Sequence, residues 1–406
     1  MTESPMGSLE MKAVILAAGE GTRLRPFTLT RPKVMLPVAG RPILQHVVQS
    51  LVASGLRDIV IVVGYKKERI MSYFGDGNMF GASIEYVVQE KQLGTAHALS
   101  LARSRLGSEF VVLGGDNIID QKTVSGLLQC GNAPCVLFTD SDIPSKYGVM
   151  EVADGRVHRI VEKPQTREGN IINTGIYRLN AKTADLIVAG VGDGQWGITD
   201  ILRRELDRVD LHAVRCEGLW LDAVYPWDLI HLNEMAMNMQ GHDIAGVVEA
   251  GAVLKGPVQV GKGSRIRSGC YIEGPVIIGE GCDIGPNSTI FPSSYIGNGC
   301  NIEAHTMIAN SILMSGVSIG SHSHICQGVF GEGVRAGPGL MAACGCGHVR
   351  VDDEFHKMDH IGGMVGDDAV IGSRVVIVSG VIVGGGCRVG DGAVLRSNVP
   401  DRSIVV

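Results

Sequence analysis

Short apolar runs alternate with amphipathic stretches between Lys12 and about Pro226. The runs have the length and the branched side chains of buried strands and lie at residues 13–16, 58–63, 83–88, 110–113 and 135–139. The amphipathic stretches have helical spacing and lie at residues 43–54, 66–74, 96–104 and 122–128. This alternation predicts an α/β fold, a doubly wound and mostly parallel sheet. Ligands of such sheets bind at the carboxyl ends of the strands.

The pattern changes after residue 246. An apolar residue recurs at every sixth position, at Val248, Leu254, Val260, Ile266, Ile272, Ile278, Ile284, Ile290, Ile296, Ile302 and Ile308. Four residues after each stands a mostly small residue, at Ala252, Val258, Ser264, Cys270, Val276, Cys282, Ser288, Ser294, Cys300, Thr306 and Ile312. A period of six fits neither a helix nor a simple alternating strand. It predicts a triangular coil with three short flat sides, each of which turns one branched and one small residue inward.

The six-residue register continues toward the end of the chain with interruptions. It slips near residues 315–317, resumes at Ile319 and Ile325, and is expected again at Val334 and Leu340. After an excursion through residues 345–364 it returns at Val365, Ile371, Ile377, Val383, Val389 and Leu395. The apolar residues of 226–241 predict a connecting helix. We therefore expect one domain at residues 11–225, a linker helix at 226–246 and a repeat domain at 247–406.

Composition narrows the class of protein. A chain of 406 residues is long enough for two domains with ample cores. The net charge of −6 and the few aromatic residues offer no basic platform for nucleic acid, and no apolar run reaches the length of a membrane span. The ten cysteines are interpreted as reduced small hydrophobic residues, which favours a cytoplasmic location. The first ten residues lack a signal-peptide core and are expected to be a frayed tail or an alternative start before Met11.

A glycine-rich turn follows the first predicted strand and reads Leu16-Ala17-Ala18-Gly19-Glu20-Gly21-Thr22-Arg23. Such a turn lets the backbone curve around an anion with its N–H groups pointing inward. Arg23 adds a planar fork of donors for phosphate oxygens, and Lys33 adds a movable point charge. The turn lacks the third glycine of the dinucleotide fingerprint and the Gly-Lys-Ser/Thr ending of a P-loop. It therefore predicts a phosphate-binding loop of another kind.

This stretch, with the Pro-Lys pair that ends at Lys33, resembles the signature of the sugar-1-phosphate nucleotidylyltransferases. Those enzymes join a nucleoside triphosphate to a sugar 1-phosphate and release pyrophosphate. The resemblance implies that the turn binds the nucleotide, through Leu16, Ala17, Ala18, Gly19, Gly21 and Thr22. It also implies that the substrates are small molecules.

A second loop follows the third predicted strand and reads Gln89-Glu-Lys-Gln92-Leu-Gly94-Thr95. Carboxamides present a donor and an acceptor together, which suits the edge of a pyrimidine, and Gly94 permits the close approach of a base. The spacing resembles the uridine-reading loop of the nucleotidylyltransferases for N-acetylglucosamine 1-phosphate, with Gln89, Gln92, Gly94 and Thr95 in matching places. The resemblance favours UTP over dTTP, although a pocket could admit both.

Asp116 stands at the end of the fourth predicted strand, directly after Gly115. A carboxylate there can hold Mg²⁺ against triphosphate oxygens, because this ion takes few protein carboxylates together with water and phosphate. In the family the corresponding aspartate is a metal ligand, and Gly115 is assigned to the nucleotide with it. The segment from Trp220 to Leu229 resembles the family's W-x-D-x-x-x-P-W-D-L, which makes Asp222 the second ligand. Uridylyl relatives can carry Asn at this place, so Asp222 fits that subfamily less closely.

Three segments between these aspartates resemble the sugar side of the family's site in order and spacing. They read Tyr147-Gly148-Val, Val161-Glu162-Lys163-Pro164 and Ile172-Asn173-Thr174-Gly175. Glu162 and Asn173 can bind sugar hydroxyls, and the backbone at Gly148 can approach the hydroxyl or acyl group. Lys163 can neutralise the sugar phosphate. These residues suit glucose and N-acetylglucosamine alike and do not name the sugar.

The predicted reaction is an in-line attack by a phosphate oxygen of the sugar 1-phosphate on the α-phosphorus of the triphosphate. The attacking oxygen is already anionic, so no general base is required, and positioning and charge neutralisation carry the rate. The predicted catalytic residues are Arg23, Lys33, Asp116, Lys163 and Asp222.

The repeat domain resembles the left-handed parallel β-helix of hexapeptide-repeat proteins, which usually form homotrimers. In bifunctional relatives this domain acetylates glucosamine 1-phosphate with acetyl-CoA, and a histidine near the register slip is the base. His322 and His324 occupy that neighbourhood and could remove a proton from an amine. Against this, Cys344 replaces an asparagine of the family, and the acidic run 352–354 replaces basic residues. Exposed histidines on a structural coil are the alternative.

A zinc site is a further hypothesis, because Cys344, Cys346, His348, His356 and His360 are suitable ligand types, although their spacing matches no common structural site. Three function classes thus remain open. The chain is a nucleotidylyltransferase whose β-helix serves assembly, a bifunctional enzyme with an acetyltransferase, or a non-catalytic regulatory subunit. The presence together of the five predicted catalytic residues argues against the third.

Overall fold

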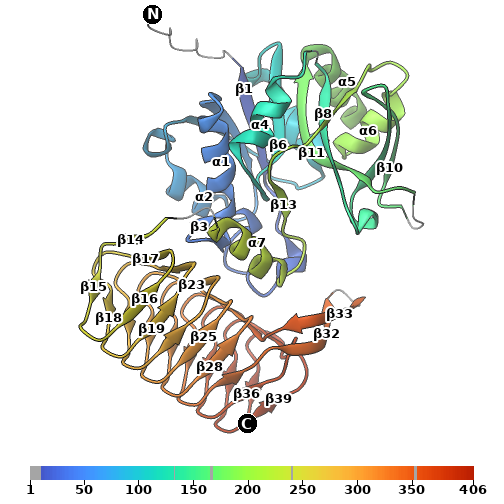
Figure 1. The fold of residues 1–406 in the computed structure, drawn as a ribbon. Helices are drawn as coiled ribbons and strands as arrows, with labels where there is room; N and C mark the ends of the chain where they lie inside the picture. The colour runs from blue at the N-terminus through green and yellow to red at the C-terminus, as the bar shows by residue number, and fades with distance from the viewer. Residues whose placement is uncertain (1–10, 132, 165–167, 239–240, 352–353) are drawn as a thin grey trace, which may run out of the picture. The chain divides into compact units, whose positions relative to one another are not determined.

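The computed structural model describes residues 11–131, 133–164, 168–238, 241–351 and 354–406. The chain forms two compact units, and neither unit is one continuous stretch of sequence. The first unit holds the residues up to Glu20 together with Ile43–Asp222, and the second holds Gly21–Pro42 together with Ala223–Val406 (Figure 1). The segment Gly21–Pro42 therefore belongs to the same unit as the repeats, whereas the sequence suggested one boundary near residue 226.

A nine-stranded sheet forms the centre of the first unit, in the order β5-β4-β1-β6-β11-β8-β12-β10-β9. Its strands are β1 (Lys12–Ala17), β4 (Asp58–Val63), β5 (Ser83–Val88), β6 (Glu109–Gly114), β8 (Cys135–Asp140), β9 (Gly148–Ala153), β10 (Arg156–Glu162), β11 (Ile171–Asn180) and β12 (His212–Arg215). The strands β5, β4, β1 and β6 are parallel, and Leu16 of β1 lies opposite Val62 and Gly114. All five strands expected from the sequence are present.

The second half of this sheet is mixed, which corrects the expectation of a mostly parallel sheet. β11 runs antiparallel to both β6 and β8, and β9 and β10 form a hairpin. Asp154 and Gly155 join the hairpin with φ angles of 50° and 72°. This is the two-residue turn that links antiparallel strands without a crossover helix, and Asp-Gly is its sequence signal.

Helices cover both faces of the sheet. They are α1 (Ile43–Ala53), α2 (Lys67–Phe74), α3 (Thr95–Ala102), α4 (Gln121–Leu128), α5 (Ala181–Gly192) and α6 (Ile198–Glu205), with short turns η3 (Asn78–Phe80), η4 (Arg103–Arg105) and η5 (Pro144–Lys146). Leu99 of α3 and Ile187 of α5 share a core with Val14 of β1. The alternate residues Ala13 and Ile15 are also fully buried, as expected of strands covered on both sides. The four helices expected from the sequence are confirmed.

The second unit is a triangular parallel β-helix built from three sheets. The first contains β14 (Asp243–Ile244), β17 (Val258–Val260), β20 (Val276–Ile278), β23 (Ser294–Ile296), β26 (Ile312–Leu313), β29 (Val329–Phe330), β34 (Met364–Val365) and β37 (Ile382–Val383). The second contains β15 (Val247–Val248), β18 (Arg265–Ile266), β21 (Asp283–Ile284), β24 (Asn301–Ile302), β27 (Ser318–Ile319), β30 (Arg335–Ala336), β35 (Val370–Ile371), β38 (Arg388–Val389) and β40 (Ile404–Val405). The third contains β16 (Val253–Lys255), β19 (Tyr271–Glu273), β22 (Thr289–Ile290), β25 (Met307–Ala309), β28 (His324–Cys326), β31 (Met341–Ala342), β36 (Val376–Ile377) and β39 (Val394–Leu395).

The inward positions agree with the six-residue period, except where the coils shorten. From Val260 to Ile308 the branched residues are buried and stack on one another in register. Leu313 lies opposite Ile296, so the register slips just after Ile308, earlier than expected. A second shortened coil follows, so that Phe330, Ala336 and Ala342 stack on Leu313, Ile319 and Ile325. They occupy the inward position at which the sequence suggested Val334 and Leu340. Val334 and Leu340 are buried at the other inward position, which the sequence did not distinguish because both positions are apolar here.

The inward cysteines pack as the sequence predicts, with one exception. The thiol of Cys282, for example, donates to the carbonyl oxygen of Gly297 in the next coil at 3.0 Å. The expectation of reduced cysteines is wrong for Cys326 and Cys344, which form a disulfide. Their 18-residue separation corresponds to about one coil, and their Cα atoms lie 5.3 Å apart. The hairpin β32 (Gly345–Val351) and β33 (Glu354–Ile361) follows and forms the expected excursion.

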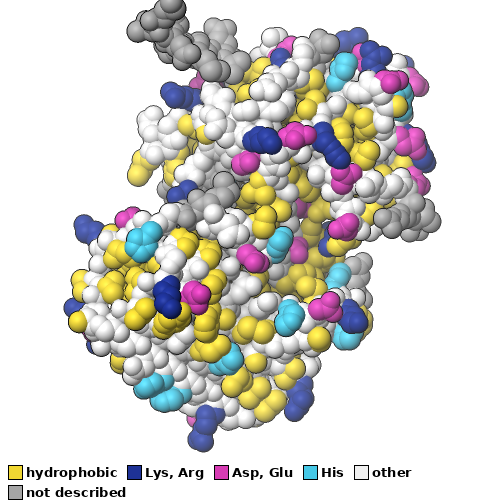
Figure 2. All heavy atoms as spheres, viewed as in Figure 1, with side chains coloured by type: hydrophobic (Ala, Val, Ile, Leu, Met, Phe, Trp, Pro, Cys, Tyr) yellow, Lys and Arg dark blue, Asp and Glu magenta, His cyan; other side chains and the backbone are white. Residues whose placement is uncertain are grey.

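The segment Gly21–Pro42 and the linker region complete the second unit. The segment contains two single-turn helices, η1 (Thr22–Leu24) and η2 (Lys33–Met35), and the strand pair β2 (Pro37–Val38) and β3 (Arg41–Pro42). The expected linker helix is α7 (Asp228–Met237). In the part of the chain that the structure describes, none of the helices is long and apolar enough to cross a membrane. Basic and acidic side chains are interspersed on the face shown in Figure 2.

Candidate active site

The two predicted metal ligands lie at the carboxyl end of β6. The short strand β7 (Asn117–Ile119) follows Asp116 directly and pairs antiparallel with β13 (Trp220–Asp222). Asp222 therefore lies opposite Asn117, the next residue after Asp116, and both aspartates are half-buried. A Cβ atom on Gly114 would lie 2.6 Å from Oδ1 of Asp116, so only glycine leaves room for this carboxylate. Two carboxylates brought near each other by this strand pair form a donor set that fits Mg²⁺.

Gly115 lies between these carboxylates and the first strand. Its N–H donates to the carbonyl oxygen of Leu16 at 2.9 Å, so this amide is used within the sheet. A Cβ atom at Gly115 would lie 3.1 Å from side-chain atoms of Ala17, Ile15 and Leu44. The glycine therefore allows the end of β6 to pack closely against β1 and α1.

The first unit contains the beginning of the glycine-rich turn. Leu16 and Ala17 are the last residues of β1, and the carbonyl oxygen of Ala18 accepts a hydrogen bond from the N–H of Tyr65 at 3.1 Å. Gly19 is exposed, with open space where its Cβ atom would lie. The chain thus leaves the sheet after Ala18.

The second unit contains the remainder of the turn and both predicted cations of the nucleotide loop. Gly21 has a left-handed backbone conformation, with φ of 70° and ψ of 48°, and begins η1. A Cβ atom there would lie 2.7 Å from Cβ of Lys33, so the turn and the lysine are packed together. The hydroxyl of Thr28 donates to the carbonyl oxygen of Gly21 at 2.9 Å. Thr22 and Arg23 follow with exposed side chains, and Lys33 is half-buried.

The glutamine-rich loop is fastened to the chain that precedes α6. Gln89 is 3% exposed, and its amide nitrogen donates to the carbonyl oxygen of Gly94 at 3.2 Å and lies 2.9 Å from Nδ1 of His97. The side-chain nitrogen of Gln89 is therefore used within the protein, where it stabilises the loop. Gln92 is exposed, and its amide nitrogen donates to the carbonyl oxygen of Gln89 at 3.2 Å.

Two contacts hold the end of the glutamine-rich loop. Gly94 has φ of 152° and lies against the backbone of Trp196, which leaves no space for a side chain. The hydroxyl of Thr95 accepts a hydrogen bond from the N–H of Ile198 at 3.0 Å. Sequence reasoning missed Trp196 and His97, because no local motif marks either residue.

The three predicted sugar ligands are brought together by β9, β10 and β11. Glu162 lies opposite Gly148 in the ladder, and a Cβ atom at Gly148 would lie 3.0 Å from Oε2 of Glu162 and 3.7 Å from Cβ of Asn173. The side-chain amide of Asn173 donates to the hydroxyl of Tyr177 at 2.6 Å and accepts from the N–H of Gly175 at 2.8 Å. Asn173 is thereby held in one orientation. Tyr177 is thus a neighbour of the predicted sugar ligand Asn173 to which the sequence analysis gave no role.

Glu162 and Lys163 are adjacent but differ in exposure. Burial raises the pKa of the Glu162 carboxyl, an effect that the charge of Lys163 partly offsets. The Lys163 side chain is 56% exposed, and its ammonium lies 3.9 Å from Oε1 of Glu162. The N–H of Lys163 donates to the carbonyl oxygen of Tyr147 at 3.0 Å. The end of β10 thus presents one cation beside Glu162, a predicted sugar ligand.

The two candidate acetyltransferase histidines lie on different parts of the coil. His322 occupies a corner, with φ of 56°, and its ring lies 4.9 Å from that of His305 in the preceding coil. His324 lies on the third sheet, in register with Met307 and Met341. His305 is a neighbour that the sequence analysis missed. Of the acidic run used in that argument, Asp352 and Asp353 lie outside the described residues.

The zinc hypothesis is wrong. The structure contains no cluster of three His, Cys, Asp or Glu side chains that could hold a metal ion within its described residues. Cys344 is bonded to Cys326, and the ring of His356 packs against Tyr225 at 4.5 Å and Trp227 at 5.2 Å. The hairpin that carries His356 thus contacts the aromatic part of the segment after Asp222.

Comparison with known protein families defines the class. The nucleotidyl transferase family matches residues 12–237, more than half of the chain, and the chain therefore belongs to this family. Residues 272–356 match a family described as the GMPPB C-terminal domain, and residues 364–397 match the hexapeptide repeat of succinyl-transferase. The second unit is thus a hexapeptide-repeat, left-handed β-helix, as the sequence predicts.

Individual relatives match about three fifths of this chain, and the chain spans less than two thirds of the length of the GlmU relatives. The bifunctional protein GlmU of Methanococcus maripaludis is 36% identical over 262 residues, which cover 63% of this chain and 62% of that protein. The low-salt glycan biosynthesis nucleotidyltransferase Agl11 of Haloferax volcanii is 32% identical over 62% of this chain and 72% of that protein. A crystal structure of a Bacillus anthracis protein assigned as a glucose-1-phosphate thymidylyltransferase, with bound sucrose, superimposes with a TM-score of 0.52 at 32% identity. It covers 57% of this chain and 98% of that one.

Proposed function

We propose that this protein is a sugar-1-phosphate nucleotidylyltransferase, which converts a nucleoside triphosphate and a sugar 1-phosphate to a nucleoside diphosphate sugar and pyrophosphate. The observation that carries the proposal is the pairing of β7 with β13, which makes Asp116 and Asp222 neighbours although they are far apart in the sequence. The names of the relatives agree, because they include a nucleotidyltransferase and a glucose-1-phosphate thymidylyltransferase of Streptomyces antibioticus.

Each predicted catalytic residue has a role that its chemistry suits. Arg23 and Lys33 neutralise the triphosphate, and Lys163 holds the sugar phosphate against electrostatic repulsion. Asp116 and Asp222 would hold Mg²⁺, which when bound offsets negative charge on the phosphates. The attacking phosphate oxygen is already anionic, so the chain supplies orientation and charge and no general base.

The glutamine-rich loop supports UTP as the preferred nucleotide, with dTTP as a second candidate. Gln92 is exposed at that loop, whereas the amide nitrogen of Gln89 is engaged in holding it. N-acetylglucosamine 1-phosphate and glucose 1-phosphate are the proposed sugar substrates, bound by Glu162 and Asn173 with the backbone of Gly148 close to the sugar.

Pyrophosphate release tests this function. The full-length chain is incubated with Mg²⁺, UTP or dTTP, and each sugar 1-phosphate in turn. We expect pyrophosphate to form only when both substrates are present, and to form faster with UTP. Absence of release with every pair would overturn the proposal and favour the regulatory-subunit alternative.

A second, bifunctional activity is the alternative supported by the GlmU relatives. It would use acetyl-CoA as a co-substrate, with His322 or His324 as the base. The observation in its favour is the pair of exposed corner rings of His305 and His322. Release of free thiol from acetyl-CoA in the presence of glucosamine 1-phosphate would establish this activity. The residual rates of His322→Ala and His324→Ala are then compared, and the variant with the lower rate identifies the base.

We also propose that copies of this chain assemble through the third sheet of the β-helix as a homotrimer. Val253, Met341 and Val394 lie in that sheet with exposed fractions of 45%, 40% and 48%. The second sheet presents Arg265, Asp283, Asn301, Ser318, Arg335 and Arg388 together with the exposed Val247, Val370 and Ile404. Exposed apolar residues that repeat along one sheet of a coil suit association with identical copies. The nucleotide substrate and the reduced, buried cysteines support the proposal of a cytoplasmic location, whereas the Cys326–Cys344 disulfide is unusual for one.

A further inference from the structure

The first sheet of the β-helix has an apolar outer face that is covered by the protein itself. Ile277 and Tyr295 lie on this face and are only 8% and 6% exposed. Gly40 lies over both, because its Cβ position would be 3.5 Å from Ile277 and 3.7 Å from Tyr295. The segment that carries Arg23 and Lys33 is thus packed on the coils at its carboxyl end.

Helix α7 fastens the same end of the segment. Asn233 is fully buried, and its side-chain oxygen accepts a hydrogen bond from the N–H of Ala39 at 2.9 Å. Its side-chain nitrogen donates to the carbonyl oxygen of Ser293, in the β-helix, at 2.8 Å. One asparagine therefore links the segment to a coil.

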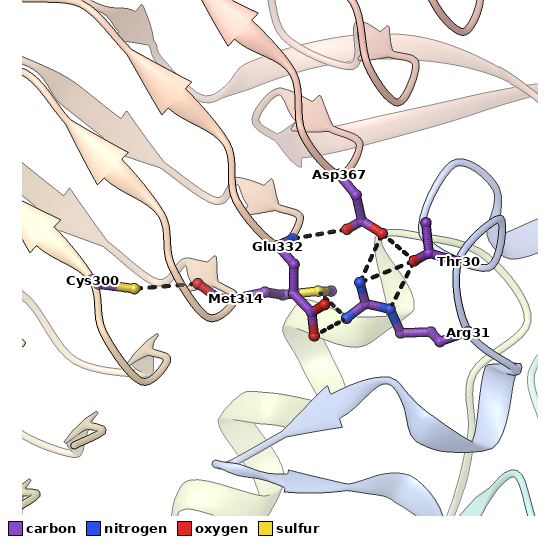
Figure 3. A network of polar contacts seen from close by, with 6 residues as sticks. All are labelled: Thr30, Arg31, Cys300, Met314, Glu332 and Asp367. Atoms are coloured by element: carbon purple, nitrogen blue, oxygen red, sulfur yellow. Dashed lines mark hydrogen bonds and ion pairs between the residues drawn. The ribbon is translucent and has the colours of Figure 1, made fainter. Parts of the chain in front are cut away.

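A second attachment lies in the middle of the segment, at Arg31 (Figure 3). The guanidinium is 4% exposed and donates to Oε1 of Glu332 and to Oδ2 of Asp367, each at 2.7 Å. The hydroxyl of Thr30 donates to the same carboxylate oxygen of Asp367. Asp367 is itself fixed, because its Oδ1 accepts from the N–H of Glu332 at 2.8 Å. Both acids belong to the β-helix.

This attachment is only two residues from Lys33 along the chain. Pro32 separates them and restricts the backbone, and η2 begins at Lys33 itself. Lys33 in turn is packed against Gly21, which begins the turn that carries Arg23. A displacement of Arg31 would therefore displace Lys33 and the turn with it.

The charges make the attachment strong. Without Asp367 the buried guanidinium would keep only Glu332, which is 38% exposed, and it would lose a charged hydrogen-bond partner in a site with little water. The guanidinium of Arg31 has hydrogen-bond acceptors on several sides, because it donates to the carboxylates of Glu332 and Asp367 and to the hydroxyl of Thr30. Such a network fixes one geometry of the segment.

We propose that Arg31 is a positioning residue, through which Glu332 and Asp367 of the β-helix set the affinity of the nucleotide loop for its triphosphate. This inference rests on the proposed function, because it assigns the loop to a nucleoside triphosphate. The β-helix then contributes to nucleotidyl transfer as well as to assembly. Neither acid touches a substrate in this role.

Kinetics of Arg31→Gln, Asp367→Asn and the double variant test the proposal. We expect each single variant to raise KM for the nucleoside triphosphate about 10-fold or more, with less than about a twofold change in KM for the sugar 1-phosphate. Because the two residues act as one unit, the double variant should resemble either single variant. The matched control is Arg267→Gln, which removes an exposed Arg–Asp pair with Asp283 in the same β-helix, 41% exposed on each side.

Amide hydrogen exchange gives a readout that does not depend on activity. In Asp367→Asn, peptides from residues 21–42 should exchange faster, while peptides from α3 keep their wild-type rates. Faster exchange with an unchanged KM for the nucleotide would show that Arg31 is merely structural. Unchanged exchange would show that the network does not fix the loop. Either result overturns the inference. If Asp367→Asn fails to fold, Glu332→Gln replaces it, since Glu332 is 38% exposed. An inactive wild type would instead overturn the proposed function.

Discussion

Asp222 and Asn117 lie opposite each other in the antiparallel pair of β13 and β7. This pairing joins the segment after α6 to the end of β6 and makes Asp222 a neighbour of Asp116. The proposed metal site therefore depends on a ladder of only a few residues. Its two acids come from distant parts of the sequence, so neither can form the site alone.

Asp222→Asn should weaken the response to Mg²⁺. We expect the Mg²⁺ concentration for half-maximal activity to rise about 10-fold or more, because a neutral amide is a poorer ligand than a carboxylate for this ion. The measurement is pyrophosphate release across a Mg²⁺ titration at saturating substrates. Asp142→Asn, at an exposed position, is the control and should leave the curve unchanged. A normal Mg²⁺ dependence in Asp222→Asn would remove this residue from the metal site.

Lys33→Ala should lower turnover by about 10²-fold with the fold intact, by analogy with the loss of one preorganised donor. The reason is that Lys33 would neutralise charge on the triphosphate during transfer. Lys122→Ala is the control, because this side chain is 66% exposed and pairs only loosely with Glu217 at 4.0 Å. Steady-state kinetics and circular dichroism of both variants give the comparison, and near-normal turnover of Lys33→Ala would exclude a catalytic role.

Gly148→Ala should raise KM for the sugar 1-phosphate about 10-fold or more, since one misplaced methyl group costs about 1–3 kcal/mol in a fitted pocket. The added Cβ atom would lie 3.0 Å from Oε2 of Glu162 and 3.3 Å from Cγ2 of Thr199. Gly126→Ala is the matched control, because its position in α4 is open. That control should leave both KM values unchanged and stabilise the protein by about 0.4–1 kcal/mol. Equal sugar KM values for the two variants would contradict the assignment of Gly148.

The pH dependence of sugar binding should report Glu162. Burial raises the pKa of this carboxyl, so as the pH falls Glu162 gains its proton at a higher pH than an ordinary glutamate does. The carboxylate is the better acceptor for sugar hydroxyls. As the pH is lowered, KM for the sugar 1-phosphate should therefore begin to rise at a pH above the range in which an ordinary glutamate titrates. Glu162→Gln shows only the titration of the substrate phosphate, so the ratio of the two KM profiles isolates the carboxyl. A ratio that stays constant with pH would contradict the prediction.

The periodic parts of the fold could be predicted from the sequence, because a repeated inward residue such as Ile284 or Ile302 has only one way to be buried. The position of Asp116 at the end of β6 could also be predicted, because this residue follows an apolar run and two glycines. The partners of Arg31 could not be predicted, because Glu332 and Asp367 carry no local signal and are distant in the chain. The second shortened coil was missed for another reason, as Phe330 and Val334 are both apolar and both buried.

The chain crosses from one unit to the other at Glu20, again at Pro42 and a third time at Asp222. No single scission of the polypeptide can therefore yield two intact halves: a fragment ending at Asp222 would keep both acids but lose the scaffold of its own cationic turn. In this chain, a fragment that is to keep the packing of that turn must therefore include the coil.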